Sequence, residues 1–386
     1  MKIRPYYAEI NLDNFRHNFR EVKRLAAGKK TFGVIKADGY GHGSVELARV
    51  LEEEKADYFA VAVITEAIEL RNNGFKQPIL ILGYTSPEFA EELVTYDITQ
   101  AVFSYEQAEV ISREAVKQGK TAKIHIKLDT GMGRVGFLPT DESVDEIIRI
   151  SRLDNLYLEG IFSHFSCSDE KDKQFAHKQL DCYKTMLNKL EDKGVKFDIR
   201  HISNSAAIID MPEAYSCYDG VRPGIILYGY YPSDEVKMDR IDLKPVMTLK
   251  ARIVNIKEVE EGTPISYGRK FYTNRRSIIA TLPFGYADGF TRLLFGKIKV
   301  IAGGKLVPVV GRICMDQCMI DITECGPLKV GDEVVVMGES DGIRNNADDF
   351  AAALGTINYE VLCMVSRRVP RVYVEGGRVI KVKNYV

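Results

Sequence analysis

The feature that most constrains the fold is a regular alternation of apolar runs and amphipathic segments. Eight apolar runs of strand length occur, near residues 32–36, 57–63, 79–83, 99–104, 123–129, 157–164, 199–204 and 221–228. Between them lie helix-like segments rich in Glu, Lys, Ala and Leu, near 44–54, 65–73, 86–94, 105–118, 141–152 and 172–193. Apolar strands separated by helices are typical of a parallel α/β sheet. Eight such units predict a (β/α)8 TIM barrel, with a doubly wound open sheet as the alternative.

After about residue 240 the pattern changes to alternating, β-branched segments separated by turn signals. Strand-like segments lie at 246–259, 277–282, 298–301, 306–310, 319–322 and 333–338, and one helix-like stretch, 346–354, interrupts them. This pattern predicts a mainly β C-terminal domain. We therefore expect a TIM barrel over 9–240 and a mainly β domain over 241–386, with residues 1–8 as a candidate addition to the second domain.

Charge and composition disfavour several classes of function. The chain has 53 basic and 54 acidic residues, so it has no overall basic field for nucleic acid or acidic lipid. No window approaches 18 uncharged apolar residues, and the start of the sequence has no apolar leader, so we expect a cytoplasmic protein without membrane contact. Seven scattered cysteines indicate reduced thiols. Cys314 and Cys318 have no second pair to complete a zinc site, so no metal is expected.

Polar residues follow the predicted barrel strands at the ends where TIM barrels carry their active sites. Five strand ends contribute, with Lys36 after the first, Lys127 and Arg134 after the fifth, His164 after the sixth, Asn204 and Ser205 after the seventh, and Arg222 and Gly224 after the eighth. Each residue alone is compatible with an ordinary loop or cap. Their convergence on one barrel mouth predicts a functional site.

The chemistry of this set indicates a carbonyl cofactor with a phosphate group. A lysine desolvated at the end of an inner strand becomes a nucleophile, so Lys36 is a candidate for Schiff-base formation. Asn204 with Ser205, and Gly224 with Ile225, fall where TIM barrels usually seat a phosphate. A lysine for an aldehyde beside a phosphate seat predicts pyridoxal 5′-phosphate (PLP). The glycine-rich segment 39–43 lacks the spacing of nucleotide-binding loops.

The chain resembles the alanine racemases, PLP-dependent enzymes of fold type III, over nearly its whole length. Nine motifs in the order of that family carry the resemblance, namely AEINL (8–12), VIKADGYGHG (34–43), KLDTGMGRVG (127–136), HISNS (201–205), RPG (222–224), ISYG (265–268), GYADG (285–289), GRICMD (311–316) and TINYE (356–360).

The resemblance implies an isomerase that interconverts L- and D-alanine and supplies D-alanine for the peptidoglycan of the cell wall. Lys36 matches the lysine that holds the cofactor and acts as one acid/base group, and Tyr267 matches the second group, on the opposite face of the cofactor. Racemisation needs two such groups because the proton leaves one face and returns to the other. In the family the tyrosine comes from the partner subunit, which implies a homodimer with shared active sites.

The same motifs imply roles around the cofactor. Arg222 matches an arginine that faces the pyridine nitrogen, which then stays unprotonated because arginine keeps its own proton. His164 matches a residue beside Tyr267 and Arg222. Tyr40 matches a tyrosine that contacts the phosphate, and Tyr359 matches one that narrows the pocket at the cofactor.

Substrate contacts are implied in the same way. Arg134 matches the arginine that contacts the substrate carboxylate, and Lys127 matches a lysine that is often carbamylated to fix that arginine. Met315 and Asp316 match a substrate-side loop from the partner subunit, and Tyr286 matches the entry corridor.

Three alternatives remain open at this point. One is a racemase with a serine or broader preference, because a serine hydroxyl is difficult to exclude by size alone. Another is a fold-type III amino-acid decarboxylase, which the motifs around Arg222 and Tyr267 disfavour. The third is a non-catalytic PLP-carrying barrel, which the additional β domain disfavours.

Overall fold

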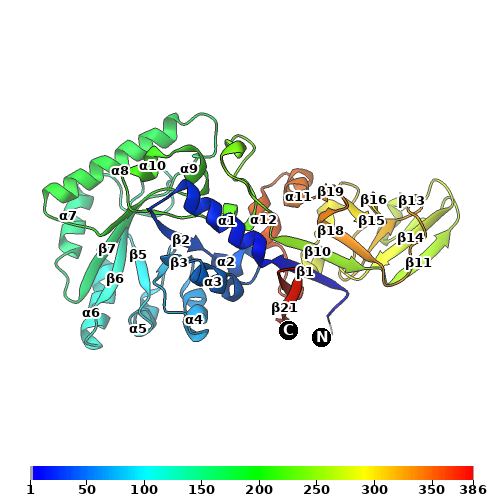
Figure 1. The fold of residues 1–386 in the computed structure, drawn as a ribbon. Coiled ribbons are helices and arrows are strands. Elements are labelled where there is room, and N and C mark those ends of the chain that lie inside the picture. Colours follow the sequence, from blue (N-terminus) through cyan, green and yellow to red (C-terminus); the bar gives the residue numbers. More distant parts are fainter. Residues whose placement is uncertain (1–2, 386) are drawn as a thin grey trace. The chain divides into compact units, whose positions relative to one another are not determined.

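The computed structural model describes residues 3–385, and its contacts divide the chain into two compact units. The barrel unit comprises Phe15–Gly39 and Ser44–Lys244, and the β unit comprises Met1–Asn14, Tyr40–Gly43 and Pro245–Val386. Each unit is built around its own main sheet, labelled in Figure 1. The domain bounds expected from the sequence, 9–240 and 241–386, stay a prediction.

The barrel unit contains a closed barrel of eight parallel strands, which confirms the predicted TIM barrel. The strands are β2 (Lys30–Val34), β3 (Tyr58–Val61), β4 (Ile79–Ile81), β5 (Thr99–Val102), β6 (Ala122–Lys127), β7 (Leu156–Phe162), β8 (Ile199–His201) and β9 (Gly220–Val221). Each of the eight apolar runs contributes one strand, and β9 closes the barrel by pairing with β2.

The last predicted strand, 221–228, is wrong after its first residue. Strand β9 ends at Val221, and Ile225–Tyr228 form the 3-10 turn η2 instead of continuing the strand. Pro223 has no N–H to donate to a sheet ladder, so the chain leaves the barrel there. The residues after Pro223 are also apolar because η2 is buried. An apolar run alone does not distinguish a buried strand from a buried helical turn.

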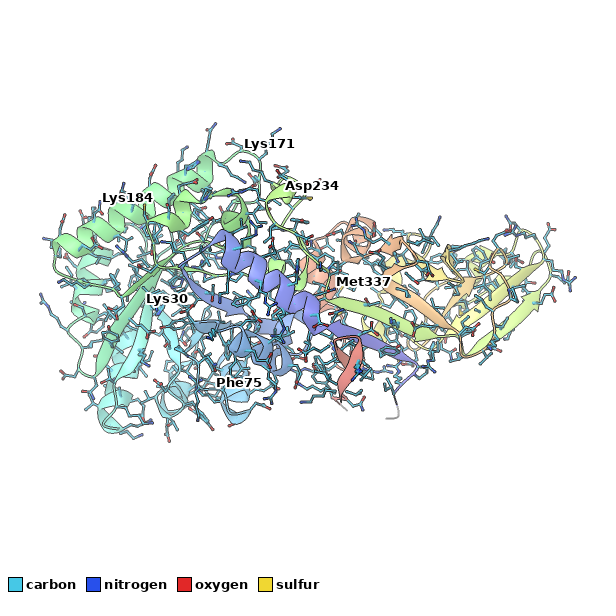
Figure 2. All side chains as sticks on the ribbon, in the orientation of Figure 1. Lys30, Phe75, Lys171, Lys184, Asp234 and Met337 are labelled. Atoms are coloured by element: carbon cyan, nitrogen blue, oxygen red, sulfur yellow. The ribbon has the colours of Figure 1, made fainter. Side chains whose placement is uncertain are left out.

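One helix, α1, precedes the first barrel strand, and the other helices of this part of the chain follow barrel strands, as Figure 1 shows. They are α1 (Leu12–Leu25), α3 (Ser44–Glu53), α4 (Ile64–Asn72), α5 (Ala90–Thr95), α6 (Tyr105–Lys117), α7 (Asp141–Ile150), α8 (Gln174–Asp192), α9 (Ser205–Asp210) and α10 (Glu213–Ser216), with the 3-10 turns η1 (Pro87–Phe89) and η3 (Met238–Arg240). Figure 2 labels Phe75, which is buried against Phe59 with ring centroids 5.5 Å apart, and Lys184, which is exposed on α8.

A left-handed turn, α2 (Lys36–Tyr40), follows the first barrel strand. The φ angles of Ala37, Asp38, Gly39 and Tyr40 are 53°, 51°, 61° and 49°. Left-handed conformation costs a residue other than glycine about 1–2 kcal/mol, so local contacts must hold the turn. The Ser44 N–H donates to Asp38 Oδ1 at 3.0 Å. Backbone strain of this kind is concentrated at functional sites, and here it comes directly after Lys36.

The β unit is mainly β, as predicted. Its main sheet has the order β11-β14-β17-β16-β15-β18-β10-β1-β20-β21, with β19 paired to β18. The strands are β1 (Tyr6–Asn11), β10 (Met247–Arg252), β11 (Asn255–Val259), β14 (Ser277–Leu282), β15 (Lys299–Ala302), β16 (Lys305–Val310), β17 (Cys318–Asp321), β18 (Glu333–Ser340), β19 (Ile343–Asn345), β20 (Arg371–Glu375) and β21 (Arg378–Lys383). A separate hairpin joins β12 (Pro264–Ile265) and β13 (Phe271–Tyr272).

Short helical segments complete the β unit. They are α11 (Ala347–Leu354), α12 (Asn358–Cys363) and the 3-10 turns η4 (Tyr267–Arg269), η5 (Tyr286–Asp288) and η6 (Arg292–Leu294). The segment Tyr40–Gly43 is attached to this unit through Arg371, whose buried guanidinium donates from Nε to the Gly41 carbonyl at 2.9 Å and from Nη2 to the Val365 carbonyl at 2.8 Å.

Candidate active site

The mouth of the barrel gathers cationic side chains around His164. Burial lowers the pKa of His164 well below its ordinary value, and Arg222, Arg134, Lys127 and Lys36 lower it further. His164 is therefore a neutral imidazole at neutral pH. Its Nδ1 lies 3.2 Å from Arg222 Nη2. Because arginine can only donate, Nδ1 is the acceptor and the proton of this ring is on Nε2.

Arg222 follows β9 and is 3% exposed. Its Nη1 donates to His201 Nδ1 at 2.8 Å. Its two Nη2–H groups are shared among the carbonyls of Ser163 at 2.7 Å and Ile202 at 2.9 Å and His164 Nδ1 at 3.2 Å. Burial lowers the pKa of Arg222 to about 10, so this side chain is still charged at neutral pH. Within residues 3–385 its hydrogen bonds use Nη1 and Nη2, which leaves the Nε–H for a further acceptor.

Lys127 is the last residue of β6 and is also 3% exposed. Its Nζ donates to the Leu128 carbonyl at 2.6 Å and lies 5.4 Å from the centre of the Phe162 ring. Burial, followed by the charge of Arg222, lowers the pKa of Lys127 to about 7. A large fraction of this amine is thus neutral near pH 7, unlike an ordinary lysine.

Arg134 is an exposed residue in the loop that follows β6. Asp129 fixes this loop, because its Oδ1 accepts from the amides of residues 131–133 at 2.8–3.0 Å and its Oδ2 accepts from the Arg134 amide at 2.9 Å. These four hydrogen bonds lower the pKa of Asp129 against the opposing effect of burial. The carboxylate therefore stays ionised and keeps Arg134 beside the strand end.

The predicted phosphate seat is assembled from two loops of the barrel unit. Asn204 caps α9 by accepting from the Ala207 amide at 3.0 Å, and it also accepts from the Ser168 hydroxyl at 2.8 Å. The Gly224 amide donates to Ser205 Oγ at 2.9 Å, which joins the two loops. Ile225, the next residue, is buried at the start of η2.

Two of the predicted site residues lie together in the β unit. The rings of Tyr40 and Tyr359 have centroids 6.2 Å apart. Tyr40 is buried, and burial together with the neighbouring Tyr359 raises the pKa of its phenol far above the ordinary value. Tyr40 is therefore a neutral hydroxyl.

Tyr267, Tyr286, Met315 and Asp316 occur on neighbouring loops of the β unit. Ser266, before Tyr267, donates from Oγ to the Arg312 carbonyl at 2.5 Å. The Tyr286 amide donates to the Cys314 carbonyl at 3.0 Å, next to Met315 in the chain. Tyr267 is 68% exposed and Met315 is 53% exposed. Asp316 accepts from Arg368 at 2.8 Å.

An open cavity of about 410 Å³ lies beside Tyr267. Apolar side chains form much of its wall, among them those of Ile265, Ile279 and Met319, together with Cys314. Exposed aromatic and apolar side chains around a cavity are typical of surfaces that receive another molecule.

Sequence reasoning missed two functional candidates behind Arg222. His125 and Glu159 are buried inside the barrel, and His125 Nε2 lies 3.1 Å from Glu159 Oε2. A signal for Glu159 was present, because it is the one charged residue before the histidine in the apolar run 157–164. His201 belongs to a motif noted above, but its partners were not evident from the sequence.

The described part of the chain offers neither a metal cluster nor a membrane helix. Within residues 3–385, no group of three or more His, Cys, Asp or Glu side chains is arranged to hold a metal ion. In the same range no helix has the length and apolarity needed to cross a membrane.

Comparison with family models gives two matches that together cover most of the chain. The model described as "Alanine racemase, N-terminal domain" matches residues 10–232, and the model described as "Alanine racemase, C-terminal domain" matches residues 246–373.

Relatives with similar sequences carry the same name over their full length. The chain is 56% identical over 384 residues to alanine racemase 1 of Clostridium acetobutylicum, covering 100% of this chain and 99% of the relative. It is 54% identical over 385 residues to alanine racemase of Clostridium novyi, covering 100% and 99%.

Solved structures of alanine racemases are also similar to this chain. Alanine racemase of Clostridium difficile 630 superposes with a TM-score of 0.96 at 50% identity, covering 100% of both chains. Alanine racemase of Bacillus anthracis with bound L-Ala-P superposes with a TM-score of 0.94 at 32% identity, covering 100% of this chain and 99% of the other.

Proposed function

Because the chain belongs to the alanine racemase family of isomerases, we propose that it interconverts L- and D-alanine with PLP held by Lys36. Bound PLP supplies an electron sink that acidifies the α-proton of an amino acid. The observation that carries the proposal is the donor set of Arg222, a buried cation at the barrel mouth with an Nε–H left for a further acceptor.

The residues at the mouth fit this cofactor. A pyridine nitrogen is a hydrogen-bond acceptor of the kind that Arg222 Nε–H requires, and arginine does not give its proton away. An arginine partner keeps the ring nitrogen unprotonated and limits the electron sink, which favours return of the proton to the α-carbon. Asn204, Ser205, Gly224 and Ile225 are assigned to the phosphate, with the Tyr40 hydroxyl, and Tyr359 is assigned to the edge of the pocket.

Two acid/base groups are assigned to the proton transfers. Lys36 takes or returns the proton on one face of the substrate, and Tyr267 does so on the other. A phenol with an ordinary pKa near 10 needs surroundings that favour the phenolate. We assign His164 to this task, because its Nε2–H is a donor and the cationic mouth around it favours a negative charge.

Tyr267 is assigned to the active site of a second copy of the chain. Tyr267 is 68% exposed and lies beside an open cavity, as expected for a residue that contacts another molecule. The assembly we propose is a homodimer in which each active site takes Lys36 from one chain and Tyr267, Met315 and Asp316 from the other. Tyr286 is assigned to the corridor that leads to this site.

Arg134 and Lys127 are assigned to binding the alanine carboxylate. A neutral lysine amine reacts with carbon dioxide to form a carbamate and release a proton, and the pKa of Lys127, about 7, makes that form available. The resulting anion pairs with Arg134 and orients it. A pocket narrowed by Tyr359 admits a methyl side chain, while serine, one hydroxyl larger, is expected to react weakly.

We propose that the protein acts in the cytoplasm, where it supplies D-alanine for the synthesis of peptidoglycan. All seven cysteines are free thiols, which suits a reducing compartment.

Replacement of Lys36 tests the proposal. Lys36→Ala is expected to abolish turnover and the absorbance of lysine-linked PLP. Lys30→Ala, at the exposed start of β2 and labelled in Figure 2, is the matched control and is expected to retain both. Retained racemisation by Lys36→Ala would contradict the assignment.

A further inference from the structure

A continuous line of buried side chains extends from Arg222 into the interior of the barrel. Arg222 Nη1 lies 2.8 Å from His201 Nδ1, and His201 Nε2 lies 2.9 Å from His125 Nδ1. His125 Nε2 lies 3.1 Å from Glu159 Oε2. Both histidines are fully buried, and none of the four side chains is more than 8% exposed.

The two ends of this line determine the direction of every hydrogen bond in it. Arginine only donates, so His201 Nδ1 accepts and its proton is on Nε2. That proton is donated to His125 Nδ1, so His125 also carries its proton on Nε2 and donates it to Glu159. An ionised carboxylate only accepts, so the sequence of donors ends there.

The charge states required for this arrangement are those that the surroundings favour. Burial lowers the pKa values of His125 and His201, which keeps both rings neutral. Burial opposes ionisation of Glu159, but its hydrogen bonds with His125 and Tyr58 bring its pKa below the ordinary value. Thr99 Oγ1 also lies 3.4 Å from Glu159 Oε2.

The backbone is shaped to place this carboxylate. Ile124 pairs with Leu158 and His125 pairs with Gly160, so Glu159 is the extra residue of a β-bulge between β6 and β7. Bulges redirect side chains and are common near active sites. A Cβ on Gly160 would lie 2.6 Å from the His125 ring, so only glycine leaves room for it. The His201 ring is stacked between Phe32 and Phe162, at centroid distances of 4.5 and 4.9 Å.

We propose that Glu159, acting through His125 and His201, is a positioning residue that fixes the orientation of Arg222 at the barrel mouth. If His201 carried its proton on Nδ1, two donors would face each other and the Arg222 guanidinium would be displaced. The Glu159 carboxylate disfavours that tautomer of His201 through the intervening His125 ring. The effect on catalysis rests on the proposed function, because Arg222 is assigned there to the cofactor ring.

The tautomers are measured on the cofactor-free protein by ¹⁵N–¹H correlation spectra of its six histidines, labelled selectively with ¹⁵N. We expect His125 and His201 of the wild type to be neutral, each with its proton on Nε2. A proton on Nδ1 of His201 would overturn the proposal. This test needs no variant, and it is independent of whether the protein racemises alanine.

Glu159→Gln tests the role of the carboxylate. A glutamine amide can accept or donate, so it no longer opposes the reversed line, in which both histidines carry their protons on Nδ1 and Arg222 is displaced. We therefore expect the His125 signals to show a mixture of the two tautomers. Asp57→Asn is the matched control, because Asp57 is a half-buried carboxylate immediately before β3 that accepts from Thr31 and has no hydrogen bond to either histidine. Unchanged tautomers in Glu159→Gln would overturn the proposal.

The same variant is then examined in the holoenzyme. We expect the kcat of Glu159→Gln to fall on the order of tenfold at nearly constant KM for alanine, the lower end of the loss seen when a residue that orients a metal ligand is replaced. The ¹⁵N resonance of labelled cofactor at the ring nitrogen should shift, and Asp57→Asn should move neither quantity. An unchanged resonance would overturn the positioning role, whereas a wild type without racemase activity would overturn only the proposed function.

Discussion

Lys127 shows how burial changes the chemistry of a single residue. The residue is 3% exposed and its amine lies near the charge of Arg222, and these surroundings lower its pKa to about 7. Because the folded-state pKa lies below the ordinary value of 10.5, the amine is mainly neutral above pH 7 and becomes protonated as the pH falls below 7. An exposed lysine stays protonated until well above this range.

We predict that Lys127 forms a carbamate with ¹³C-labelled carbon dioxide at about pH 8, where an ordinary lysine remains protonated. The ¹³C NMR spectrum should show one carbamate resonance, which is lost on acidification below the pKa of the amine. Lys127→Ala should abolish the resonance, and Lys123→Ala, on the same strand but partly exposed, should retain it. A resonance that persists in Lys127→Ala would contradict this assignment.

At the level of structural elements, the loop after β6 is held by close backbone packing. Gly136 has a φ of +134°, and a Cβ there would lie 2.4 Å from the Asp129 amide nitrogen. Gly133 has a φ of +69°, but no atom lies within 4 Å of a Cβ at that position. A side chain at Gly133 would therefore meet only backbone strain, whereas a side chain at Gly136 would meet strain and a steric collision.

Gly133→Ala is predicted to lower the free energy of unfolding by about 1–2 kcal/mol, the cost of a left-handed alanine. Gly136→Ala is predicted to lower it further, because a collision is added to the strain, and to raise the KM for alanine by displacing Arg134. Urea unfolding and steady-state kinetics measure the two effects. Equal destabilisation by the two substitutions would show that the collision is relieved elsewhere.

An element could be predicted from the sequence when the interactions that form it lie within its own residues. The barrel strands were evident from apolar runs, because burial on both faces acts on each strand separately. Strand β1 was missed, since it forms only by pairing with β10 and β20, more than 200 residues away. Glu159 was missed because its inward direction depends on a bulge, and a bulge is a property of two paired strands.

At the scale of the whole molecule, the proposed site residues are distributed over both compact units. Lys36, Lys127, His164 and Arg222 belong to the barrel unit, and Tyr267 belongs to the β unit. The motifs identified these residues without showing how the units assemble. If the site is shared between two copies of the chain, two variants that are inactive for different reasons can complement each other, whereas a site within one chain does not allow this.

We predict that two inactive variants restore activity when mixed. Lys36→Ala and Tyr267→Phe each damage every site of their own homodimer. In a mixed dimer, one site takes Lys36 and Tyr267 from the two different chains and is intact, so random exchange should restore about a quarter of wild-type activity. Exchange of Lys36→Ala with Tyr272→Phe serves as the comparison, because the exposed Tyr272 is outside the proposed site. Absence of recovery in a verified mixed dimer would place both groups in one chain.

The most direct test of the central claim is chiral analysis of L-alanine after incubation with the purified protein and PLP, with L-serine and L-lysine in parallel. We predict that alanine reaches a near-equal mixture of the two enantiomers, that serine changes slowly and that lysine is unchanged. L-alanine that keeps its configuration while the protein holds PLP on Lys36 would contradict the proposed function.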